Sequence, residues 1–149
     1  MDFKEFTGEV QHRIEGDSQG RAVRATRAVL TTLGDRLDAG GASDVASPLP
    51  MEIDRYVVEG DHGQRFGYQE FLDRVVTRAN NEDVDLNFGK SGEMEMADAD
   101  YATKAIVDLV IEQLPAGQET HLHDQLPEDE YADIFEFYEA EETPWEKIE

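Results

Sequence analysis

The amino-acid sequence predicts an all-α protein, a single domain of about six to eight helices built from two pseudo-repeated helical halves. Residues 25–58 align with 102–135 without a gap at an offset of 77 positions. Upstream, residues 3–13 align with 68–78 at an offset of 65, so the second half carries an insertion of 77 − 65 = 12 residues. Within these segments apolar residues recur at the spacing of one helical face. Each half therefore leaves an apolar face that its twin can bury.

The first half is expected to hold two amphipathic helices followed by two short ones. Asp2 and Glu5 have the spacing of a capping box, which predicts a helix start at Phe3. A second and longer helix is expected over about 18–37, ended by a left-handed glycine cap at Gly40 or Gly41. Short helices are then expected over 42–47 and, directly after Leu49-Pro50, over 51–59.

The second half repeats this order with a more apolar long helix. Its first helix is expected to begin at about Tyr68, and Gly117 is expected to be the left-handed cap of the long helix. Leu109 and Ile111 stand where the first copy has Thr32 and Gly34. A helix that is apolar on more than one face lies deep in the protein or forms an oligomer contact. We expect burial at the centre of the domain, with a homodimer surface as the alternative.

The repeat also fixes the expected domain organisation. We expect one domain over 1–149, because a chain of this length can bury one core while either half alone is near the lower size limit. The predicted parts are repeat one (1–59), a linker (60–65), repeat two (66–139) with the insertion within 79–97, and an acidic tail (140–149). The tail holds the one tryptophan, Trp145, for which we weigh packing onto the domain against contact with a partner.

The charge balance is the second feature that constrains function. The chain has 35 acidic and 13 basic residues, a net charge of −22, and only four lysines among its cations, yet 39% of its residues are hydrophobic. This combination indicates a folded protein of a salt-adapted organism, in which K⁺ or Na⁺ binds weakly to the acidic surface. In 1 M salt the Debye length is about 3 Å, so surface carboxylates repel each other weakly. The alternative is an ordinary acidic protein that binds cations or a basic partner.

The chain offers little support for an enzyme or a membrane protein. It has no cysteine, no glycine-rich phosphate loop and no recognisable nucleophile motif, so we expect no catalytic residue and no cofactor. No apolar run approaches the roughly 20 residues that span a bilayer, and the first residues do not resemble a signal peptide. We therefore expect a cytoplasmic protein without a membrane partner.

Two histidines are the candidates for a metal site. His121 and His123 supply imidazole nitrogens of the kind that bind zinc or nickel. On a helix, however, positions i and i+2 point apart, and no second ligand cluster stands at a metalloenzyme spacing. We therefore expect both to be solvent-exposed helix residues, with metal binding as the alternative.

A stripe of arginines is the candidate for phosphate or partner contact. Arg21, Arg24 and Arg27 recur three positions apart on the first long helix, with Arg13 as a further member. Residues 1–78 have a net charge of −4 and residues 79–149 a net charge of −18, so the first half is less acidic. The stripe can contact phosphates, or it can pair with Asp17, Asp35 and the acidic second half. We expect pairing within the protein rather than nucleic-acid binding.

The repeated segments resemble the DUF2267 family, small proteins of unknown function in bacteria and haloarchaea. The resemblance rests on FTGEVQHR (6–13), ATRAVLTTLGDRL (25–37), Gly40-Gly41 and Leu49-Pro50, with a weaker copy at 71–78 and 102–127. It implies an all-helical tandem repeat and brings no active site, so no residue role is carried over. Taken together, the sequence predicts a non-enzymatic cytoplasmic interaction or regulatory module whose partner is another protein or a second copy of the chain.

Overall fold

The computed structural model describes residues 1–14, 18–81, 94–126, 130–132 and 134. Within these ranges the protein is all-helical, as the sequence predicts, and forms no strand. Residues 130–132 and 134 are helical in addition to seven named helices. The named helices are α1 (Phe3–Arg13), α2 (Gln19–Arg36), α3 (Ala39–Ala46), α4 (Ile53–Val58), α5 (Tyr68–Asn81), α6 (Met96–Gln113) and α7 (Gln118–Gln125).

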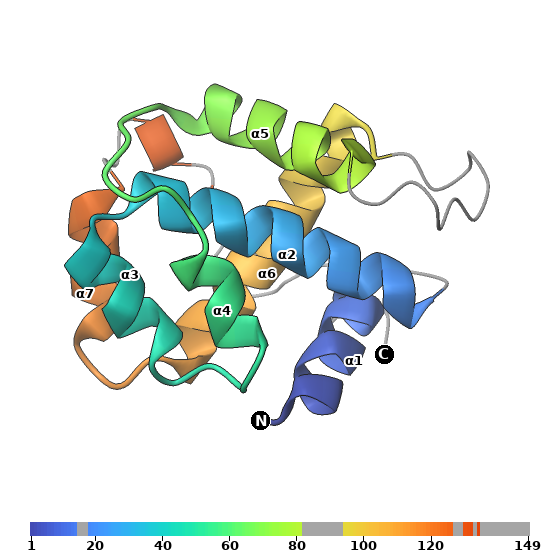
Figure 1. Ribbon diagram of the computed structural model, residues 1–149, viewed down its shortest axis with the longest axis horizontal. Helices are drawn as coiled ribbons and strands as arrows, with labels where there is room; N and C mark the ends of the chain where they lie inside the picture. The colour runs from blue at the N-terminus through green and yellow to red at the C-terminus, as the bar shows by residue number, and fades with distance from the viewer. Residues whose placement is uncertain (15–17, 82–93, 127–129, 133, 135–149) are drawn as a thin grey trace.

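Helix α2 lies at the centre of the arrangement. In Figure 1 it runs between α5 on one side and α1, α3 and α4 on the other, with α6 crossing behind it. The packing agrees with this view, since α2 contacts each of these five helices. The sequence placed the second long helix at the centre. In the structure that position belongs to the first, because the linker and α4 fold back onto it.

The repeat is present in the helix boundaries themselves. Helices α2 and α6 differ by 77 positions at both ends, and the first residues of α1 and α5 differ by 65. The apolar face predicted for α2 is buried, and so is its counterpart on α6 except for the half-buried Leu114. Leu109 and Ile111 are 1% and 4% exposed, which confirms the prediction that the second long helix is buried. These two side chains therefore offer no free apolar surface for a homodimer.

The predicted glycine caps are wrong. Helix α2 ends at Leu37 in an extended conformation, and Gly40 and Gly41 belong to the first turn of α3. Asp38 is the N-cap of α3, and its carboxylate accepts a hydrogen bond of 2.7 Å from the amide of Gly41. Gly117 is left-handed, with φ of 94°, but it precedes α7 and does not close α6. In both halves the glycine serves the start of the next helix.

The linker replaces the missing glycine cap of α2. The amide of Gly63 donates to the carbonyl of Leu37, and the amide of Gln64 donates to that of Asp35, at 2.8 and 2.9 Å. Nδ1 of His62 lies 2.7 Å from the carbonyl oxygen of Gly34, so this nitrogen carries the proton and donates. The last carbonyls of a helix have no partner within it. Residues 60–65 therefore form a docked part of the fold.

A close approach of two glycines holds α4 and the linker against α2. A Cβ atom at Gly34 would overlap the carbonyl oxygen of Val57, and one at Gly60 would lie 2.6 Å from the amide nitrogen of Asp35. Only glycine fits at both positions, because the obstructing atoms belong to the backbone. The second copy has Ile111 in place of Gly34, so this close contact belongs to the first half alone.

The remaining sequence predictions are met in part. Helix α4 starts after the Leu49-Pro50 pair as predicted, although it is shorter than 51–59. Of the corresponding helix expected in the second half, residues 130–132 and 134 are helical, and its neighbours 127–129, 133 and 135–149 lie outside the described residues. The insertion within 79–97 is framed by Asn80, whose side chain exchanges hydrogen bonds of 2.7 and 2.8 Å with the backbone of Met94. Residues 82–93 and Trp145 fall outside the described part of the chain.

An aromatic cluster closes the core beneath the linker. The hydroxyl of Tyr131 donates to the carbonyl of Phe66 at 2.7 Å, and its ring meets that of Phe71 edge-on, at 6.1 Å between centroids. Arg36 donates to the same carbonyl at 3.0 Å. Burial is the main cause that raises the pKa of Tyr131 to about 12, against a smaller opposing effect of the Arg36 charge. The folded state therefore holds the neutral phenol.

We expect the free energy of unfolding to fall as the pH rises from 10 toward 12, by about 2–3 kcal/mol from Tyr131 alone. The reason is that Tyr131 loses its proton near pH 10 when unfolded but only near pH 12 when folded. Its contribution is thus complete below pH 10. Urea unfolding of the wild-type protein and of Tyr131→Phe across this range measures the difference, with Tyr101→Phe as the control for loss of a phenol. Parallel pH profiles for wild type and Tyr131→Phe would contradict the assignment.

Candidate functional site

The arginine at the end of α1 forms a buried ion-pair network with α6. Arg13 is 5% exposed, and its Nη1 and Nη2 donate to Asp108 at 3.2 Å and to Glu112 at 2.8 Å. Its Nε donates to Glu9 of the same helix at 2.7 Å. A residue of the first half thus binds two carboxylates of the second half.

A matching network joins α5 to α2. The carboxylate of Asp35 is 1% exposed, accepts a hydrogen bond from Arg74 at 3.1 Å and forms an ion pair of 2.8 Å with Arg78. The amide of Asp61 in the linker donates to its other oxygen at 2.8 Å. The buried charge of Asp35 is therefore paired and hydrogen-bonded, as a carboxylate out of water must be.

The two networks are reciprocal. Arg13 and Arg78 are equivalent at the offset of 65, and Asp35 and Glu112 are equivalent at the offset of 77. Arg13 of the first half binds Glu112 of the second half, and Arg78 of the second half binds Asp35 of the first half. This reciprocity is the property of a twofold interface. The arginine that both copies of the motif share is thus a structural residue that joins the halves.

Both networks hold their guanidinium groups charged. For Arg13 the largest effect is burial, which disfavours the charged form, but hydrogen bonds and attraction from Glu9 and Glu112 outweigh it and raise the pKa. The same balance, with Glu70 and Asp35 as partners, raises the pKa of Arg74. Neither arginine changes its charge over the pH range in which the protein folds.

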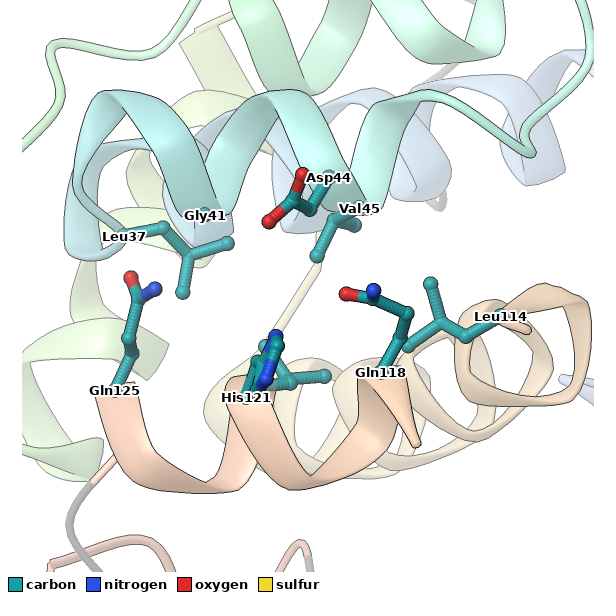
Figure 2. Close-up of a pocket in the computed structure, with 9 residues that line it drawn as sticks. Leu37, Gly41, Asp44, Val45, Leu114, Gln118, His121 and Gln125 are labelled. Atoms are coloured by element: carbon teal, nitrogen blue, oxygen red, sulfur yellow. The ribbon is translucent and has the colours of Figure 1, made fainter. Parts of the chain in front are cut away.

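A small cavity lies between α3 and α7 and is lined largely by repeat-equivalent residues from the two halves (Figure 2). Its volume is about 10 Å³, which has room for about one water molecule. The side-chain oxygen of Gln118 at its edge is buried without a hydrogen-bond partner. The equivalent pairs in the lining are Leu37 and Leu114, Gly41 and Gln118, Asp44 and His121, and Val45 and Leu122.

The two histidines do not come together with further metal ligands. His121 is exposed and points across the cavity toward α3, which carries Asp44 (Figure 2), while His123 is half-buried two positions further on. Across the described ranges no three His, Cys, Asp or Glu side chains gather closely enough to hold a metal ion. Glutamine is the cross-half contact here, since Gln125 accepts from the amide of Asp38 at 3.0 Å.

The arginine stripe lies on the outer side of α2. Arg21 and Arg24 are half-buried, and the side chain of Arg27 is 48% exposed. Arg27 lies 4.0 Å from Glu59 and stacks over the ring of Tyr56, 5.9 Å from its centroid. The stripe does pair within the protein through Arg27.

Two details of the predicted stripe are wrong. Asp35, one of its expected partners, is bound by Arg74 and Arg78 instead, and Asp17, the other, lies outside the described residues. Arg13, its expected further member, is buried in the network with α6. Residue spacing along the chain could not reveal the ion pairs of Asp35 with α5 or of Arg13 with α6, because each joins residues that are far apart in sequence.

Two exposed apolar side chains, one in the turn before α4 and one at its end, were missed by the sequence analysis. Met51 is 77% exposed and Val58 56% exposed, the largest values among the exposed large hydrophobic residues of the described chain. Val58 is the last residue of α4, whereas Met51 lies in the turn before the helix and is separated from it by Glu52, whose φ is 80°. Helix α4 has six residues, too few for the spacing of its apolar side chains to show which of them face solvent. The sequence therefore did not reveal the exposure of Val58.

The sequence matches the model of a known protein family. The family model described as "Uncharacterized conserved protein (DUF2267)" matches residues 3–134. The chain belongs to the DUF2267 family. Among curated proteins the chain has no match. In addition, no described helix of this DUF2267 protein is long and apolar enough to cross a membrane.

We expect Arg13→Met to lower the free energy of unfolding by about 3–5 kcal/mol, because it leaves the buried carboxylate of Asp108 without its guanidinium partner. The matched control is Arg27→Met on the outer side of α2, whose pair with Glu59 is half exposed and worth about 0–1 kcal/mol. Chemical unfolding monitored by far-UV circular dichroism measures both. Equal losses for the two variants would show that the interhalf network does not hold the halves together.

Proposed function

We propose that this DUF2267 protein is a non-enzymatic interaction or regulatory module that acts in the cytoplasm of a salt-adapted organism. One observation carries the proposal: the arginine that both halves share, at 13 and 78, forms ion pairs that join the halves. The motif thus has a structural role. The functional surface then lies among the exposed residues, where a partner protein can bind.

The charge of the chain supports the salt-adapted part of the proposal. The net charge is −22, yet the buried carboxylate of Asp35 and the buried guanidinium of Arg13 are paired inside the fold. Most of the excess negative charge therefore remains at the surface, where a high concentration of cations screens it. Buried pairs are screened far less, so the fold keeps its interhalf contacts in concentrated salt.

We expect the helicity of the isolated protein to rise with KCl between dilute buffer and about 2 M, because screening removes repulsion among surface carboxylates. Circular dichroism at 222 nm along a KCl titration measures this. A titration with tetramethylammonium chloride separates screening from specific binding of K⁺. A protein that is equally helical and equally stable in dilute buffer would contradict salt adaptation.

The interaction proposal is tested by purification of the tagged protein from its own cells in molar KCl throughout, followed by mass spectrometry. We expect a stoichiometric protein partner. The Arg13→Met variant serves as the control for nonspecific capture, since loss of the interhalf network perturbs the fold. Recovery of the chain without a partner, together with turnover of a small molecule in an activity screen, would overturn the proposal.

A further inference from the structure

Arg36, the last residue of α2, is a buried cation without a carboxylate partner. It is 6% exposed, and no Asp or Glu of the described chain forms an ion pair with it. The other buried charged residues of the described chain are paired, since Arg13 binds Asp108 and Asp35 binds two arginines. The second copy has the neutral Gln113 at the equivalent position. The unpaired charge therefore belongs to the first half alone.

The groups around Arg36 hold its guanidinium without neutralising it. Its Nε donates to the carbonyl of Phe66 at 3.0 Å, and its guanidinium carbon lies 5.6 Å from the centroid of the Tyr131 ring. An arginine side chain has five N–H donors, so most of them have no acceptor in the described chain. A carbonyl dipole and an aromatic face attract a cation but carry no net negative charge. A buried charge in this state is costly until an anion pairs with it.

The unused donors of Arg36 are within reach of the solvent. The enclosed side-chain atoms that lack a hydrogen-bond partner, among the described residues, are oxygens of Asp54, Thr103 and Gln118. No nitrogen of Arg36 is among them, and a small part of its surface is exposed. Such an opening admits a water molecule or a small ion. Water would accept the hydrogen bonds, whereas an anion would accept them and also balance the charge.

The net charge of −22 confines anion binding to concentrated salt. In 1 M salt the Debye length is about 3 Å, so distant carboxylates are screened while a guanidinium still acts on an ion in contact with it. Glu130 is a nearby competitor, because a Cβ built at Gly67 would lie 3.5 Å from its Oε2. Its exposed carboxylate nevertheless forms no ion pair with Arg36. The position beside the guanidinium is thus left to an ion from solution.

We propose that Arg36 binds a small inorganic anion, chloride in a KCl medium, through its Nη groups. The anion neutralises a guanidinium that also holds the Phe66 carbonyl and the Tyr131 ring, so it strengthens the contact of α2 with the linker and the second half. Stability then depends on which anion is present as well as on ionic strength. This inference concerns the core of the protein and does not depend on a partner protein.

The first test is urea unfolding, followed by circular dichroism, at a constant 2 M K⁺ while chloride replaces gluconate. An anion that binds only the folded state stabilises it. We expect the change to chloride to favour the folded state of the wild type about fivefold more than that of Arg36→Gln, which carries the residue of the second copy. Arg27→Gln, which removes an exposed arginine, should keep the wild-type response. Comparing variants cancels the general effect of each anion on apolar burial.

The second test locates the ion in the wild-type protein and needs no variant. Crystals are grown in molar KBr, and anomalous diffraction at the bromine edge identifies bound bromide. We expect a bromide ion in contact with an Nη atom of Arg36. This measurement decides the proposal even if Arg36→Gln does not fold.

Three outcomes would overturn the inference. The first is an equal response to chloride in wild type and Arg36→Gln, which would reduce any bromide seen beside Arg36 to binding at crystal concentration only. The second is the absence of bromide beside Arg36. The third is a carboxylate of the chain paired with Arg36 in the crystal. Glu130→Gln tests the described candidate for such a pair. Its response to chloride should persist, and loss of that response would assign the neutralising charge to Glu130.

Discussion

The reciprocal ion pairs between the halves are the constraint on which the rest of the structure depends. Arg13 and Arg78 stand at equivalent positions, and each binds a carboxylate of the opposite half. Arg13 and Asp35 are almost fully buried. A buried charge without a partner is costly, so separation of the halves would leave the Arg13 and Asp35 side chains either exposed to water or buried and unpaired. The ion pairs therefore specify how the halves meet, while the apolar faces of α2 and α6 provide most of the burial. The ion pairs fix the relative orientation of the two halves because they need a defined geometry. The burial of apolar side chains stabilises that orientation without selecting it.

The twofold relation is broken in ways that give the first half its own character. Gly34 admits Val57 and the linker against α2, whereas its equivalent, Ile111, fills the space with a side chain. Asp35 gains a third donor from the linker, the amide of Asp61. The half-exposed Arg27 and the exposed Met51 and Val58 also belong to this half. The shared residues build the fold, and the differences between the copies create surfaces that only one half presents.

The sequence predicted what depends on local order and missed what depends on distant partners. Periodicity located α2 and α6, and Asp2 with Glu5 forms the predicted capping box. Gly40 was misplaced because the chain ends α2 with amides from residues 63 and 64, contacts that no local pattern encodes. For the candidate site, the stripe at Arg21, Arg24 and Arg27 was found, but the partners of Asp35 and the exposure of Met51 and Val58 were not. Both follow from tertiary packing around α4 and α5.

High salt connects these features, because it weakens exposed ion pairs and leaves buried ones and apolar contacts in place. Arg27 and Glu59 belong to the first class, and Arg13 with Asp108 belongs to the second. Under the proposed salt adaptation, a net charge of −22 would therefore not attract partners over long distances, because concentrated salt screens it. Recognition then depends on short-range contacts in which an apolar side chain excludes water beside a positioned charge. Arg27 shows how a fold can position an exposed charge for such contacts, since its guanidinium stacks over the ring of Tyr56, 5.9 Å from the centroid, and lies 4.0 Å from Glu59.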